Sequence, residues 1–73
     1  MQIHIGNRIL EVLKQKHITV NEFAEMCASD RTNMYRILKK ENIDLALLRR
    51  FSIKLQHNFF KDLSEDFEEN NLL

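Results

Sequence analysis

Apolar residues recur at three- and four-residue spacing along most of this chain, and this spacing predicts short amphipathic helices. The first predicted helix covers residues 6–16, and its apolar face, which begins one residue earlier, has four members: Ile5, Ile9, Val12 and Leu13. A second repeat follows Thr19 and is predicted to end at Cys27 or Ala28; its apolar residues are Val20, Phe23, Ala24 and Cys27. A third, from Asp30 to about Lys39, would bury Met34, Ile37 and Leu38.

Two further segments complete the pattern. A fourth helix is predicted over residues 44–56, with an inner face of Leu45, Leu48, Phe51, Ser52 and Leu55. Phe59, Phe60 and Leu63 predict a short fifth helix or turn that folds back onto the core. Residues 65–73 are expected to form an acidic, flexible tail. The predicted fold is an all-α bundle of four to five short helices over residues 1–64, followed by this tail.

Local signals mark where these helices begin and end. Thr19 is a suitable N-cap, and Glu22 three residues later would complete a capping box. Asp30 is a suitable N-cap for the third helix, where its charge also suits the helix dipole. His17 follows the first helix at a position that favours a left-handed backbone, which histidine tolerates better than most residues. These signals predict three separate helices between residues 6 and 39.

The segment 19–39 therefore reads as two short helices joined by a tight turn, which is the pattern of a helix-turn-helix. The outward face of its second helix has side chains that hydrogen-bond nucleic acid: Arg31, Thr32, Asn33, Tyr35 and Arg36. In such a motif the second helix can lie in the major groove of double-stranded DNA.

Composition limits the alternatives. A chain of 73 residues fits one small domain, too small to enclose a deep catalytic cleft, and it has no nucleophile–base set and no glycine-rich phosphate loop. We therefore expect no enzyme activity and no cofactor. The histidines His4, His17 and His57 are scattered and predict no metal site. Without a long apolar run, a secretion signal or a second cysteine, the chain is expected to be cytoplasmic, with Cys27 as a small core residue.

Charge is distributed unevenly although the formal net charge is zero. Residues 30–54 contain seven basic and three acidic side chains, whereas residues 55–73 contain one lysine and five acids. Because a polyanion responds to the local patch rather than to the total, the basic middle of the chain is compatible with DNA. Arg49, Arg50 and Lys54 on the fourth helix either enlarge this patch or serve solubility.

At these residues, over about 5–55, the chain resembles the lambda-repressor-like helix-turn-helix superfamily of Xre/Cro-type regulators. The resemblance rests on Ala24 inside the first helix of the motif, Asp30 as the cap, and Met34 and Ile37 at the following apolar positions. It implies base contacts from Arg31, Thr32, Asn33, Tyr35 and Arg36. It also implies phosphate contacts from Thr19, Lys39, Lys40 and Asn42.

The chain departs from this pattern at two positions. Val20 replaces a glutamine that often contacts the DNA backbone, and Ala28 replaces the usual turn glycine. A left-handed alanine would cost about 1 kcal/mol or more, so a slightly reshaped turn is expected.

Two functions are compatible with this sequence. The first is a sequence-specific DNA-binding transcriptional regulator, in which Arg31 and Arg36 can each pair with guanine and Asn33 with adenine. So small a domain would need a homodimer on two half-sites to bind usefully. The second is a protein–protein interaction module with the same fold, which no longer binds DNA and uses Phe59, Phe60 and the acidic tail; zero net charge and Val20 favour it.

Overall fold

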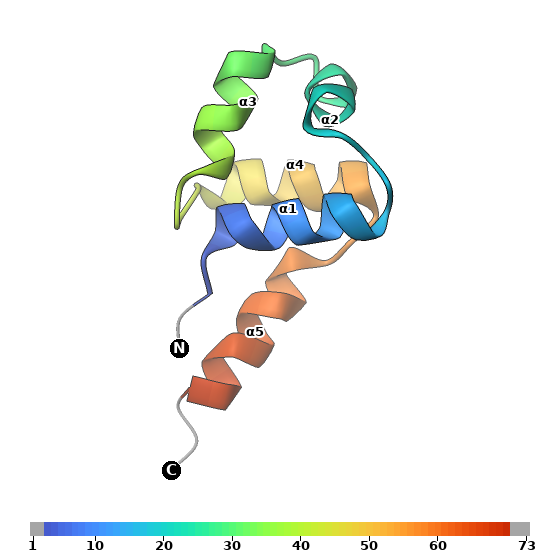
Figure 1. Cartoon of the computed structure of the whole chain (residues 1–73). Coiled ribbons are helices and arrows are strands. Elements are labelled where there is room, and N and C mark those ends of the chain that lie inside the picture. Colours follow the sequence, from blue (N-terminus) through green and yellow to red (C-terminus); the bar gives the residue numbers. More distant parts are fainter. Residues whose placement is uncertain (1–2, 71–73) are drawn as a thin grey trace.

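The computed structural model describes residues 3–70, and over this range the chain is entirely helical and loop, without strands (Figure 1). The five helices are α1 (Ile5–Gln15), α2 (Val20–Met26), α3 (Arg31–Leu38), α4 (Leu45–Leu55) and α5 (Phe59–Asn70). Figure 1 shows α2 and α3 on one side of α1 and α4, while α5 extends away on the other side. The all-α prediction is confirmed.

Polar side chains begin the helices, because the first amides of a helix have no partner within it. The side chains of Thr19, Asp30 and Asp44 accept hydrogen bonds from the backbone amides three residues later. The Thr19–Glu22 capping box is present in both directions, as predicted. The His4 ring also caps α1, with Nδ1 accepting from the Asn7 amide at 3.0 Å.

One hydrophobic core joins the helices. All four apolar residues of the first predicted face are buried, and so are Phe23, Met34 and Phe51. The rings of Phe23 and Phe51 meet edge-on with centroids 4.9 Å apart, which connects α2 to α4. Leu45, predicted on the inner face of α4, is 68% exposed, because this first residue of the helix lies beyond the edge of the core.

The fifth helix is longer than the sequence predicted. Instead of a short turn and a frayed tail from Glu65, α5 is a single helix of 12 residues that continues to Asn70. No glycine or proline interrupts it, Asn58 Oδ1 accepts from the Lys61 amide at 3.1 Å, and Asn70 Nδ2 donates to the Asp66 carbonyl at 2.8 Å. Phe59 is fully buried whereas Phe60 is 37% exposed. The end of the expected tail, residues 71–73, lies outside the described range.

The start of α1 is bonded to the segment that follows α3. The backbone amides of Ile5 and Gly6 donate to the carbonyl oxygens of Glu41 and Lys40 at 2.9 and 3.0 Å. The two segments approach so closely that a Cβ at Gly6 would collide with the Leu38 carbonyl and lie 2.7 Å from the Lys40 oxygen. Only glycine fits at this position without a shift of the backbone.

A charged cluster joins α5 to α1. Asp62 Oδ2 accepts from Arg8 Nε at 2.9 Å and lies 2.7 Å from His57 Nε2, while Arg8 Nη1 also reaches Glu11. Burial alone raises the pKa of Asp62, but the hydrogen bonds and charges of Arg8 and His57 outweigh it, so this pKa lies below its ordinary value. The hydrogen bond to Asp62 raises the pKa of Arg8. The cluster attaches the first turn of α5 to the bundle.

Replacing Gly6 with alanine tests the close approach of α1 to α3. We expect Gly6→Ala to lower the free energy of unfolding by about 2 kcal/mol, because the overpacking outweighs the higher helix propensity of alanine. Urea denaturation followed by circular dichroism measures this change. Asn7→Ala, an exposed position in the same turn, is the matched control and should leave stability nearly unchanged. Equal stability of the Gly6→Ala variant and the wild type would contradict the assigned contact.

Removing the Asp62 charge tests the cluster. We expect Asp62→Asn to destabilise the protein by about 1–2 kcal/mol at neutral pH. Because the folded-state pKa is lowered, the carboxylate stabilises the fold fully above its unfolded pKa of about 3.9 and loses this effect as the pH falls through the folded value. The difference between the two proteins should therefore shrink between pH values of about 5 and 2. Urea denaturation at several pH values across this range measures the difference, and the exposed Glu25→Gln serves as the control. A difference between Asp62→Asn and the wild type that stayed constant with pH would contradict the role assigned to the Asp62 carboxylate.

Candidate nucleic-acid interface

A four-residue connection sets the position of α3 relative to α2. The Ser29 amide donates to the Ala24 carbonyl at 2.8 Å, and the Ala28 amide donates to the Glu25 carbonyl at 3.0 Å. This pair of bonds is a Schellman motif, which requires a left-handed residue at its turning point. Ala28 adopts this conformation with φ 51°, so the expectation of a reshaped turn was wrong. The turn keeps its ordinary geometry and alanine bears the strain.

The outward face of α3 gathers the predicted base-contacting residues. Each of the five side chains is exposed to solvent: Arg31, Thr32, Asn33, Tyr35 and Arg36. On the opposite face Met34 and Leu38 are buried in the core, so the rotation of α3 about its own axis is set by packing. Tyr35 is a large ring that stays 48% exposed.

The cations of this face have no acidic partner in the described part of the chain. The ion pairs there involve only the cluster around Arg8 and Asp62, and neither Arg31 nor Arg36 takes part in one. Asn33 is less free, because its Nδ2 donates to Ser29 Oγ at 3.4 Å. This bond is long and exposed, and a stronger acceptor can replace it.

The predicted phosphate contacts differ in their surroundings. Lys39, Lys40 and Asn42 are exposed and follow α3 directly, in the segment whose carbonyls the start of α1 binds. The backbone amide of Thr19 already donates to Glu22 Oε1 at 2.9 Å, and its hydroxyl accepts from the Glu22 amide. These bonds lower the pKa of Glu22. The Glu22 carboxylate therefore already accepts from the Thr19 amide, which a phosphate would need as its donor.

Val20 in α2 and Cys27, the C-cap of this helix, add no polar contact. Val20 is half-buried and packs against the core. Cys27 is half-buried as well, and burial raises the pKa of its thiol, although Lys54 and Arg50 oppose this effect. A protonated thiol against the core agrees with the structural role predicted for Cys27.

Arg50 lies near this surface, although the sequence did not predict it as a contact residue. It lines a hollow of about 230 Å³ together with Ser29 and Asn33, between the turn before α3 and the middle of α4. The sequence placed Arg50 on an outer face of α4 but contained no signal for which helix that face meets. Through Arg50, α4 adds a cation beside the first turn of α3.

The described residues were also compared with the patterns of a metal site and of a membrane-spanning helix, and neither pattern is present among them. No group of three or more histidine, cysteine or acidic side chains is arranged there to hold a metal ion. No helix in the same range is both long and apolar enough to cross a bilayer.

No protein-family model matches this chain, and the searches of curated proteins and of solved structures also found no match. The interpretation of this surface therefore rests on the residues and geometry described above.

The left-handed Ala28 leads to a testable difference in stability. We expect Ala28→Gly to raise the free energy of unfolding by about 1 kcal/mol, since glycine adopts positive φ without a steric penalty. Thermal and urea denaturation measure this gain. Alanine-to-glycine replacement at the exposed Ala46, the second residue of α4, should instead destabilise, by less than the roughly 1 kcal/mol that glycine costs in a helix interior. Destabilisation by both replacements would show that residue 28 is not left-handed in solution.

Proposed function

We propose that this protein is a sequence-specific DNA-binding transcriptional regulator of the Xre/Cro type, with a lambda-repressor-like helix-turn-helix formed by α2 and α3. It acts in the cytoplasm on double-stranded DNA, as a homodimer. The observation that supports this most strongly is the face of α3, where Arg31, Asn33 and Arg36 are exposed and both arginines lack an acidic partner in the described chain. Packing of Met34 and Leu38 on the other face holds these side chains outward.

Each exposed group has a specific counterpart in the major groove. An arginine donates two hydrogen bonds to O6 and N7 of guanine, and an asparagine pairs in the same way with N6 and N7 of adenine. Thr32 and Tyr35 suit a thymine methyl group or a phosphate. Arg31, Asn33 and Arg36 would therefore discriminate among base pairs.

Phosphate contacts would set the position of α3 in the groove. Lys39 and Lys40 lie at the end of α3 and Asn42 just beyond it, on a segment that α1 holds by two backbone bonds. Arg50 is suited to a phosphate near the other end of α3, because it lies beside Ser29 and Asn33. Cations at both ends of the helix would grip the backbone along the groove.

A protein–protein interaction module with the same fold is the second candidate. Two observations favour it: Val20 offers no polar contact, and the Glu22 carboxylate occupies the Thr19 amide at the start of α2. In this alternative the protein binds no DNA at any salt concentration.

DNA binding by α3 can be tested with a randomised duplex pool. We expect selection of a defined, palindromic site, and Arg36→Ala or Arg31→Ala should weaken binding to it by about 1–3 kcal/mol each. Fluorescence anisotropy at low and physiological salt measures both affinity and salt dependence. Lys39→Ala should weaken binding to all sequences alike and reduce the salt slope by about one unit.

Lys14→Ala, which removes an exposed cation from α1, is the matched control and should bind as the wild type does. Folded protein that binds no duplex even at low salt would exclude the regulator and favour the interaction module.

A further inference from the structure

The hollow of about 230 Å³ between α3 and α4 has an apolar inside. Three half-buried side chains that pack against the core border it, namely Cys27, Ile37 and Leu47. The buried Met34 and Phe51 form its floor. The backbone of α3 packs mainly against α1 and α2, so the space toward α4 is left to side chains. Apolar surface therefore lies directly behind the helix that we propose for reading DNA.

The rim of this hollow is polar and cationic. Arg50 borders it from α4, while Ser29 and Asn33 border it from the turn and from α3. Arg50 is exposed and takes part in none of the ion pairs of the described residues, and none of the residues that line the hollow is acidic. An arginine that lacks an anion at the edge of a hollow favours an occupant with a carboxylate or a similar planar anion.

The volume of the hollow limits the size of its occupant. Pockets for drug-sized molecules measure roughly 300–1,000 Å³, so this hollow suits something smaller. An apolar cavity of about 150 Å³ in another protein binds benzene, which has six carbon atoms. By the same ratio the hollow has room for about nine non-hydrogen atoms, which is one ring with a carboxylate attached.

We propose that this hollow binds a small apolar carboxylic acid of about the size of benzoate, and that this ligand lowers the affinity of the protein for DNA. The ring lies against Cys27, Ile37 and Leu47, and the carboxylate pairs with Arg50 at the rim. A neutral ring would leave the arginine without an anion, and a small inorganic anion would leave the apolar surface in contact with water. A ligand with both parts matches both the inside and the rim of the hollow.

The effect on DNA rests on the proposed function, in which Arg50 contacts a phosphate. A carboxylate bound to the Arg50 guanidinium removes this contact, so the ligand and DNA compete for one cation. Each then lowers the affinity of the protein for the other by the same factor, which we expect to be about fivefold or more. Loss of one phosphate contact should also reduce the salt slope of DNA binding by about one unit. The ligand site itself is argued without DNA and can be tested without it.

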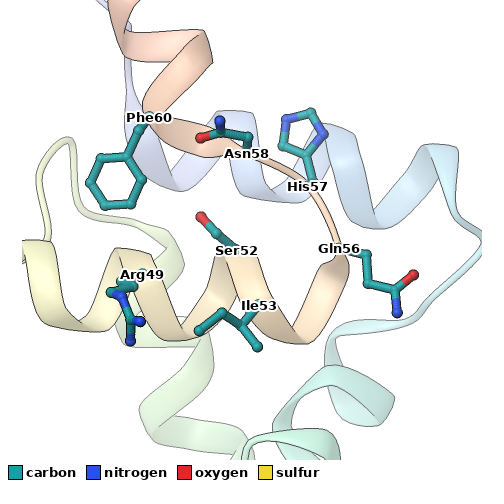
Figure 2. A pocket seen from close by; sticks show the side chains of 7 residues that line it. All are labelled: Arg49, Ser52, Ile53, Gln56, His57, Asn58 and Phe60. Atoms are coloured by element: carbon teal, nitrogen blue, oxygen red, sulfur yellow. The ribbon is translucent and has the colours of Figure 1, made fainter.

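A second hollow, of about 460 Å³, supplies a control within the same helix. It lies between α4 and the start of α5, and Arg49 borders it (Figure 2). Like Arg50, Arg49 is exposed and takes part in none of the ion pairs of the described residues. Replacing either arginine removes the same charge from α4, but only Arg50 borders the proposed ligand site.

Titration with benzoate, followed by nuclear magnetic resonance, tests the ligand site. Benzoate should shift the backbone amide signals around the hollow, among them those of Ser29 and Leu47, with a dissociation constant on the order of 1 mM or below. Benzamide has the same shape without the charge, and acetate has the charge without the ring. Both should bind about tenfold or more weakly. No binding of benzoate, shifts spread evenly over the surface, or equal binding of benzoate and either analogue would overturn the proposal.

Two matched variants test the role of the arginine. Arg50→Gln should weaken benzoate binding about tenfold and leave benzamide binding unchanged, because only the carboxylate uses the charge. Arg49→Gln should bind benzoate as the wild type does. Circular dichroism establishes that both variants are folded. Equal effects of the two replacements would show that benzoate responds to the general charge of α4, and would overturn the proposal.

Duplex binding then separates this inference from the proposed function. Benzoate should weaken wild-type binding to the selected site about fivefold or more and leave binding by Arg50→Gln unchanged, with sodium chloride at equal ionic strength as the control. Benzoate binding by a protein that binds no DNA would support the ligand site and exclude both the regulator and the competition. DNA binding by a protein that binds no benzoate would support the regulator and exclude the ligand site. Equal DNA affinity with and without bound benzoate would exclude the competition.

Discussion

Two backbone hydrogen bonds at the start of α1 determine where α3 lies. The amides of Ile5 and Gly6 have no acceptor within their own helix, and they donate to the carbonyls of Glu41 and Lys40 just after α3. The positive end of the α1 dipole thus meets carbonyl oxygens that would otherwise need water. With the Schellman turn at its other end, α3 is held at both termini, and the exposed arginines and Asn33 take their positions from that framework.

The single glycine of the chain, Gly6, lies where α1 approaches the end of α3 and not in a turn. Gly6 has a helical backbone, and its value is the absence of a side chain where two segments touch. The positions that favour glycine for conformational reasons are occupied by His17, Ala28 and Gln56, all with φ between 51° and 58°. Each ends a helix with the same pair of backbone bonds, so the fold obtains its sharp turns without glycine.

Features that depend on residues close together in the sequence were predicted, and features that depend on distant residues were missed. Periodicity and capping depend on neighbours three or four residues away, which explains why the first four helices, the Thr19–Glu22 box and the Asp30 cap were found. The exposed face of α3 followed because Met34 and Leu38 mark its opposite side. The length of α5 was missed, since acids and asparagines resemble a tail unless their hydrogen bonds are seen.

Contacts between distant segments could not be predicted in the same way. Asp62 and Arg8 are 54 residues apart, and Arg50 meets the turn before α3 only through the packing of α4. The Thr19 amide is a different case, because the predicted capping box already implied that Glu22 would occupy it. The sequence indicated that Ala28 would be strained if it were left-handed. It could not show whether the residue adopts that conformation or the turn changes its geometry instead.

The three left-handed helix ends have a consequence for the lifetime of the protein in the cell. A non-glycine residue in this conformation costs about 1 kcal/mol, and three such costs multiply the unfolded fraction by roughly a hundred. Proteases act on that fraction, so a small domain with these ends is degraded faster than one with glycine there. Abundance can therefore be adjusted at His17, Ala28 and Gln56 without altering the outward face of α3 or the rings of the core.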